Sequence, residues 1–173
     1  MKLKNKIAII TGGGKGIGKE ICLGLAKEGA KIIIADLDKE NSSNVVETII
    51  QNGGDAIYVE TNVSSEQSVK NLITKSINKF NQIDILINNA GIRHVKKLED
   101  HNLNDWNDMI SVNLTGPYIC CQAVIPQMKK IGKGKIINFG SIASFMGRPD
   151  RVGYVAAKSG VLGLTCLLYT SDA

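Results

Sequence analysis

The chain has 173 residues, of which 43% are hydrophobic, which is enough for one buried domain and too few for two. Its formal net charge is +5, but the lysines are spread along the chain, which favours a solvated basic surface over a nucleic-acid site. No apolar run reaches transmembrane length, and the apolar stretch 7–10 is too short for a secretory signal, so we expect no membrane partner.

Apolar runs alternate with amphipathic stretches from one end of the chain to the other. The apolar runs are mostly continuous Ile, Val and Leu, which is typical of parallel strands covered on both faces. Repeated β-α-β units predict an α/β fold, a doubly wound parallel sheet of the Rossmann-like kind, incomplete at its C-terminal end. The predicted strands are residues 6–11, 31–35, 55–60, 83–88 and 135–139.

Apolar residues at three- and four-residue spacing predict helices between these strands. Ser64 and Gln67 are expected to form a capping box in front of the third helix. Pro126 is expected to kink a longer helical region that follows the fourth strand. The predicted helices include 17–25, 45–50, 69–80 and 105–129.

The first strand breaks into a glycine-rich turn, Thr11–Gly18. In a parallel sheet the first strand–helix turn takes the phosphates of a dinucleotide. Gly12 lets the chain leave the strand, while Gly16 and Gly18 clear space for the pyrophosphate and for the helix, whose N-terminal N–H groups face the anion. The alternative is a plain tight loop, but the position between strand and helix favours phosphate binding.

Asp36 closes the second strand, where a carboxylate can accept both hydroxyls of the adenosine ribose and repel a 2′-phosphate. The alternative role is an N-cap for the next helix, which Asp38 could fill equally well. We therefore expect NAD rather than NADP. Lys15 argues the other way, because its ammonium could compensate a phosphate.

Several motifs in order resemble the short-chain dehydrogenase/reductase family. They are T-G-x-x-x-G-x-G at Thr11–Gly18, N-N-A-G at Asn88–Gly91, a helical Asn113, Ser141, and Y-x-x-x-K at Tyr154 and Lys158. The resemblance covers residues 1 to about 165 and implies hydride transfer between NAD(P)(H) and an alcohol or ketone. The closest-looking members are oxoacyl-carrier-protein reductases and sugar or small-alcohol dehydrogenases. The first group generally prefers NADP, against which Asp36 argues.

The resemblance also implies where the cofactor binds. Asn89, Ala90 and Gly91 would border the adenosine pocket, and Asn62-Val63 would contact adenine, where the family more often has Asp-Val. Asn62 still offers an acceptor to an exocyclic amine. The predicted cofactor-binding residues are Gly12, Lys15, Gly16, Ile17, Gly18, Asp36, Leu37, Asn62, Val63, Asn89, Ala90, Gly91, Tyr154 and Lys158.

Tyr154 is predicted to be the acid–base residue at the substrate oxygen. An unperturbed phenol has a pKa about three units too high for neutral pH, a difference of ~4 kcal/mol. Lys158 lies on the same helical face, and a cation at about 4 Å in an effective dielectric near 20 supplies on the order of 4 kcal/mol. The alternative is a surface Tyr–Lys pair at ordinary helical spacing.

Ser141 and Asn113 complete the predicted catalytic group. Ser141 would hydrogen-bond the substrate oxygen, or else be a simple cap. By resemblance, Lys158 would bond the nicotinamide ribose and Asn113 would hold a water that links Lys158 to solvent. Otherwise Asn113 marks a helix irregularity.

A few further side chains are weaker candidates. The histidines at 94 and 101 flank the basic loop Arg93–Lys97 and are expected to be solvent-exposed rather than ligating. Trp106 is predicted to be a core or helix-start residue. Arg148 and Arg151 could meet an acidic substrate group, with a surface position as the alternative.

The four cysteines lack zinc or C-x-x-C spacing, so we expect no metal, no disulfide framework and reduced thiols acting as small apolar residues in a cytoplasmic protein. They are Cys22, Cys120, Cys121 and Cys166.

Residues 166–173 read like a translated sequencing adapter, which suggests a partial catalytic domain over residues 1–165 and a foreign tail that ends the last helix. The resemblance then implies two absent strands, an absent substrate-covering loop, and a fifth strand left as an aggregation-prone edge. Full-length relatives would form homo-oligomers through helix 105–129 and the Tyr154 helix. The alternatives to an alcohol dehydrogenase or ketoreductase are a non-catalytic dinucleotide-binding module and an inactive truncated fragment.

Overall fold

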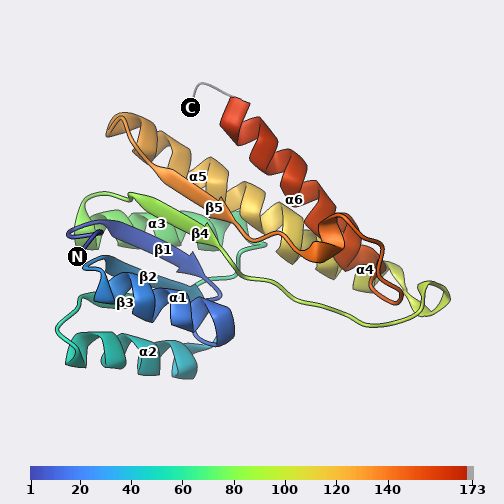
Figure 1. The fold of residues 1–173 in the computed structure, drawn as a ribbon, viewed down its shortest axis with the longest axis horizontal. Helices are drawn as coiled ribbons and strands as arrows, with labels where there is room; N and C mark the ends of the chain where they lie inside the picture. The colour runs from blue at the N-terminus through green and yellow to red at the C-terminus, as the bar shows by residue number, and fades with distance from the viewer. Residues whose placement is uncertain (171–173) are drawn as a thin grey trace.

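A computed structural model describes residues 1–170 of the chain. At its centre is a five-stranded sheet in the order β3-β2-β1-β4-β5, with every neighbouring pair parallel (Figure 1). The predicted doubly wound parallel sheet is therefore confirmed. The strands are β1 (Ile7–Thr11), β2 (Lys31–Asp36), β3 (Ala56–Glu60), β4 (Ile85–Asn88) and β5 (Lys135–Asn138).

Helices connect the strands as the sequence periodicity predicts. None of the helices that the structure describes has the length and apolar character needed to cross a membrane. The helices are α1 (Gly16–Lys27), α2 (Lys39–Gln51), α3 (Glu66–Phe80), α4 (Leu103–Ile110), α5 (Gly116–Lys130) and α6 (Val152–Thr170), with short turns η1 (Leu98–Asp100), η2 (Ser111–Thr115) and η3 (Ile142–Ser144).

Alternate residues of the buried strands face opposite layers of helices. Ile9 of β1 packs in the cluster that includes residues of α3 and α5. Its neighbour Ile10 packs in the other cluster, with residues of α1 and α2. Both side chains are fully buried, and each contributes about 1.5–3 kcal/mol by leaving water. These two cores fix the carboxyl ends of the strands, where the candidate site lies.

One local prediction about the helices is wrong and another is confirmed. The cap of α3 is Ser65, which accepts a hydrogen bond from the Ser68 amide, because Ser64 is already bonded to the side chain of Asn62. The long helical region 105–129 is confirmed, as α4, the π-helical turn η2 and α5 follow one another without a gap; Pro126 lies inside α5, and a kink there stays a prediction. The π-helical turn contains Asn113, as its alternative role as a helix irregularity predicts.

The last helix and the last strand bear on the predicted tail. The chain stays helical through Thr170, so the expected end of the helix before Cys166 is wrong, while residues 171–173 of that tail lie outside the described part. Strand β5 is an edge of the described sheet, since it pairs only with β4. Its Ile137 is 48% exposed.

Asp84 ties the start of the sheet together. Its carboxylate accepts hydrogen bonds from the Ile7 amide (2.9 Å), Gln82 (2.8 Å) and Lys6 (3.2 Å), and the residue is 4% exposed. Burial alone would raise the pKa of the Asp84 carboxyl, but the bonds from Ile7, Gln82 and Lys6 together lower it.

We expect Asp84→Asn to lower the free energy of unfolding by about 1–3 kcal/mol, because the charged acceptor is lost in a buried place. A carboxyl with a lowered folded-state pKa stabilises the fold above its unfolded pKa, which is about 4, and loses this contribution as pH falls through the folded value. Urea denaturation between about pH 7 and pH 3 should therefore show less acid dependence in the variant. Asp55→Asn, in an exposed pair with Lys31, is the control; equal acid dependence in Asp84→Asn and the unmodified chain would contradict the assignment.

Candidate active site

The glycine turn between β1 and α1 packs very closely against the first turn of α1 and against Asn89. Gly12 has a φ of +66°, a left-handed backbone that favours glycine. A Cβ on Gly18 would collide with the Gly12 carbonyl oxygen and lie 2.6 Å from the Asn89 side-chain amide. The N-cap residue of α1, Lys15, makes no side-chain cap, so the first N–H groups of this helix are not satisfied by a capping side chain.

The end of β4 is bonded directly to this turn. The Asn89 side-chain amide donates to the carbonyl oxygens of Thr11 and Gly12, each at 3.0 Å. The Thr11 hydroxyl oxygen accepts from the backbone amides of Asn89 and Ala90, also at 3.0 Å. The positioning role of Thr11 was not predicted, although its place at the last buried position of a strand before a glycine could have indicated it.

A pocket of about 500 Å³ lies over the turn and the ends of β2, β3 and β4. All the predicted cofactor-binding residues except Gly16, Tyr154 and Lys158 line it. Gly16 adopts a left-handed backbone with a φ of +55° but is not among the lining residues.

Asp36 sits at the rim of this pocket with both carboxylate oxygens engaged. One accepts from the Gly14 amide at 2.9 Å and the other from the Asp38 amide at 3.0 Å. Asp38, not Asp36, caps α2 by accepting from the Asn41 amide. Lys15 lies 3.8 Å from the Asp38 carboxylate, so its charge is partly balanced within the chain.

Asn62 lines the pocket, but its acceptor is already used. The side-chain oxygen accepts from both the amide (3.0 Å) and the hydroxyl (2.7 Å) of Ser64. A carbonyl oxygen has two lone pairs, so the expectation that this oxygen is available to adenine is wrong. The side-chain amide of Asn62 remains available to donate a hydrogen bond to a ligand in this pocket.

A second pocket of about 410 Å³ contains Tyr154 and Lys158, together with Asn113. It shares four lining residues with the first pocket, so the two form one continuous crevice across the carboxyl edge of the sheet. The shared residues are Ile17, Asn89, Gly91 and Ile92.

Lys158 is buried beside Tyr154. Its ammonium is 5.9 Å from the centroid of the Tyr154 ring and donates a 2.7 Å hydrogen bond to the Phe139 carbonyl oxygen. Burial lowers the pKa of the Lys158 amine, because a low-dielectric environment disfavours the charged form. The protonated amine therefore costs folding free energy, and this cost falls as pH rises through the lowered pKa.

The hydroxyls of Tyr154 and Ser141 are both available as donors. Neither donates to an acceptor among the residues that the structure describes. The Ser141 oxygen accepts from the Ala143 amide and caps η3, as its alternative role predicts. Ser141 is not among the lining residues of the Tyr154 pocket, although the adjacent Gly140 is.

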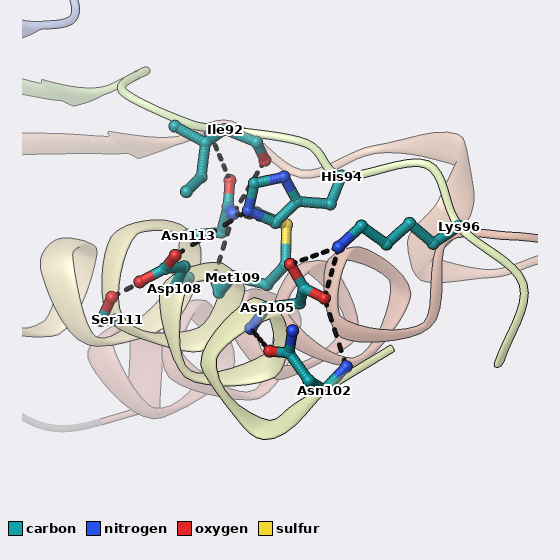
Figure 2. Close-up of polar contacts among 9 residues, drawn as sticks. All are labelled: Ile92, His94, Lys96, Asn102, Asp105, Asp108, Met109, Ser111 and Asn113. Carbon is teal, nitrogen blue, oxygen red and sulfur yellow. Dashed lines mark hydrogen bonds and ion pairs between the residues drawn. The ribbon is translucent and has the colours of Figure 1, made fainter. Parts of the chain in front are cut away.

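Asn113 clamps the loop that follows β4 (Figure 2). Its side-chain amide donates to the carbonyl oxygens of Ile92 and Met109, each at 3.0 Å, and its side-chain oxygen accepts from the Ile92 amide at 3.2 Å. The residue is fully buried within the π-helical turn. The position of this side chain is thus set by direct bonds to the protein, whereas a bound water stays a prediction.

The loop after Gly91 lies against α4 through two further contacts (Figure 2). His94 Nε2 is 3.9 Å from the Asp108 carboxylate. Lys96 donates to both oxygens of Asp105 at 2.7 and 2.8 Å. The hydrogen bonds from Lys96 and from the Asn102 amide lower the pKa of the Asp105 carboxyl and outweigh the opposing effect of burial.

Several minor predictions are corrected here. His94 and His101 are half-buried rather than solvent-exposed, with Nε2 atoms shielded from solvent. Trp106 lies in the first turn of α4 and is 38% exposed, so of the two predicted roles it has the one at the start of a helix and not the one in the core. Arg148 and Arg151 are not among the lining residues of the Tyr154 pocket, whereas Arg93 is.

Three cysteines are buried free thiols, at positions 22, 120 and 121. Burial raises the pKa of Cys22 to about 12, with a further contribution from Asp36, and that of Cys120 to about 12. These thiols therefore pack as small apolar groups. Across residues 1–170, no three His, Cys, Asp or Glu side chains gather in a way that could hold a metal ion.

The parallel sheet, the glycine turn and the crevice at the carboxyl ends of the strands define a Rossmann-like α/β protein. The model of the short chain dehydrogenase family matches residues 6–170. The chain belongs to this family.

Individual relatives agree with this assignment. The chain is 40% identical to an uncharacterized oxidoreductase of Thermotoga maritima over 98% of its length. It is 42% identical to a 3-oxoacyl-[acyl-carrier-protein] reductase of Synechocystis sp. over 94% of its length. A crystal structure from Sinorhizobium meliloti 1021, of a protein assigned to the short-chain alcohol dehydrogenases, superposes with a TM-score of 0.93 at 31% identity over 96% of this chain. The chain spans 66% of the length of each of these proteins.

Proposed function

We propose that the protein is an oxidoreductase that transfers a hydride between a nicotinamide dinucleotide and an alcohol or ketone, with Tyr154 as the acid–base residue. The observation that carries the proposal is the crevice: the pocket of Tyr154 and Lys158 shares four lining residues with the pocket over the glycine turn. A dinucleotide lying along this crevice would bring its reactive ring beside Tyr154.

The chain's own groups fit such a cofactor. The glycine turn leaves no room for a side chain at Gly18, and the start of α1 offers N–H groups without a capping side chain, which suits a pyrophosphate. Asp36 stands where it could accept from ribose hydroxyls, since each carboxylate oxygen makes only one bond within the protein. A nicotinamide ring beside Tyr154 would supply or accept the hydride.

The proton is handled by Tyr154. In the reducing direction its hydroxyl donates to the carbonyl oxygen of the substrate, and Ser141 donates a second hydrogen bond to the same atom. Lys158, whose ammonium lies 5.9 Å from the centroid of the Tyr154 ring, would then stabilise the phenolate by charge attraction.

The proposal is tested by mixing the protein with NADH and a panel of ketones, sugars and acyl thioesters, and following the nicotinamide absorbance. The oxoacyl and alcohol substrates in the names of the relatives define the range of the panel. Binding of NADH without oxidation by any of these compounds would favour the second candidate, a non-catalytic dinucleotide-binding module, which the glycine turn alone supports.

The preference for NAD rests on Asp36. We expect the protein to bind NADH at least about tenfold more tightly than NADPH, because a carboxylate and a 2′-phosphate at close range repel by more than 1.4 kcal/mol. Asp36→Asn should bring the two dissociation constants close together, since an amide oxygen keeps one acceptor without the charge. Fluorescence titration of both cofactors measures this, with Asp55→Asn as a control far from the pocket. If Asp36→Asn keeps the same preference for NADH over NADPH, another residue must distinguish the two cofactors.

The same proposal includes a cytoplasmic site of action and a homo-oligomer. Buried free thiols suit a reducing compartment. The exposed Tyr118 of α5 and Leu167 of α6 are apolar surface on the two helices through which family members are expected to associate.

A further inference from the structure

Two cations of the loop after Gly91, Arg93 and Lys97, have no acidic partner among the residues that the structure describes, and of these two only Arg93 lines the Tyr154 pocket. Of the other basic side chains of this loop, His94 faces Asp108 and Lys96 is bonded to Asp105. Arg93, between Ile92 and His94, pairs with no carboxylate among the residues that the structure describes. It is exposed and lines the same pocket as Tyr154.

The charged side chains that line this pocket are all positive. Its ten lining residues include two cations, Arg93 and Lys158, and no acid. Lys158 is directed to the Phe139 carbonyl oxygen, which is a neutral acceptor. A pocket lined by positive charge concentrates anions, and the guanidinium is the group in it that is free to meet one.

The backbone on both sides of Arg93 is held in place. Ile92 is bonded through both its amide and its carbonyl oxygen to Asn113. The amide of Lys96 donates to the carbonyl oxygen of Asp150. Little backbone freedom is therefore lost when the Arg93 side chain binds a ligand, which favours affinity.

We propose that Arg93 binds an anionic group, a carboxylate or a phosphate, on a small carbonyl substrate. This inference rests on the proposed function and names the substrate class of that site. A planar guanidinium matches such anions with two parallel hydrogen bonds, and a pocket of about 410 Å³ suits a small molecule. The substrate would lie with its carbonyl oxygen at Tyr154 and its charged end at the loop.

The test compares matched ligands that differ in charge. Calorimetry without cofactor measures the binding of acetoacetate against ethyl acetoacetate, and of dihydroxyacetone phosphate against dihydroxyacetone. We expect the charged member of at least one pair to bind roughly tenfold to hundredfold more tightly, the range for a hydrogen bond to a charged group. The pair that shows the difference identifies the anion as carboxylate or phosphate.

Variants assign the effect to one side chain. Arg93→Ala should abolish the advantage of the charged ligand, Arg93→Lys should keep part of it, and Arg148→Ala, an exposed residue outside the pocket, should keep all of it. An advantage that survives Arg93→Ala, or no difference within either pair, including no binding at all, would overturn the inference. Failure of the NADH assay alone would instead count against the proposed function, because these binding measurements need no turnover.

Discussion

Tyr154→Phe is expected to lower kcat for NADH-dependent carbonyl reduction by about a hundredfold to ten-thousandfold, the usual contribution of a positioned acid–base group. The hydroxyl bonds to nothing else among the described residues, so its removal takes away a proton donor and no structural contact. The phenylalanine ring still fills the space beside Lys158. Binding of NADH should therefore be unchanged.

Steady-state kinetics and NADH titration on the same preparations separate these two effects. Tyr118→Phe is the matched control, since its exposed hydroxyl accepts a hydrogen bond from Gln122 on the surface of α5. This variant should keep full activity. Turnover that is retained in Tyr154→Phe would transfer the acid–base role to another group and remove the central element of the proposed mechanism.

Gly18→Ala is expected to abolish measurable NADH binding and to lower the free energy of unfolding by about 1–3 kcal/mol, as overpacking does. The new Cβ would meet the Gly12 carbonyl oxygen and the Asn89 amide, neither of which can withdraw without breaking the bond between them. Either α1 moves off β1 or the turn opens. Both changes displace the N–H groups that would face the pyrophosphate.

The same helix supplies the control for this variant. A Cβ on Gly24 meets nothing within 4 Å, so Gly24→Ala should stabilise the protein by about 0.5–1 kcal/mol through helix propensity and leave cofactor binding unchanged. Urea denaturation and NADH titration check both variants. Normal NADH affinity in Gly18→Ala would show that the tight approach of helix and turn is not needed for the cofactor.

The architecture could be predicted because the strands are buried on both faces. Continuous runs of β-branched residues such as Lys31–Ala35 are typical of parallel strands that are covered on both faces. The ends of each predicted strand lie within two residues of the ends of the observed strand. The gathering of Thr11–Gly18, Asn89 and Tyr154 at one edge follows from the same topology, since all parallel strands end there.

What could not be predicted depends on local competition between polar groups. Ser64 satisfies Asn62 rather than α3, so the cap moved by one residue and the expected adenine acceptor was lost. The π-helical turn brings Asn113 against Ile92, a contact that helical periodicity does not contain. The sequence shows Arg93 as one of several charges in a basic loop, and its place in the lining of the Tyr154 pocket, without an acidic partner among the described residues, is visible only in the fold.

The bond from Lys158 to Phe139 has a consequence for dynamics. Phe139 directly follows β5, the margin of the described sheet, and marginal strands open by local unfolding more readily than central ones. Each such opening removes the acceptor that orients the ammonium. Local opening of β5 would therefore disorder the Lys158 site without unfolding β1 or β2.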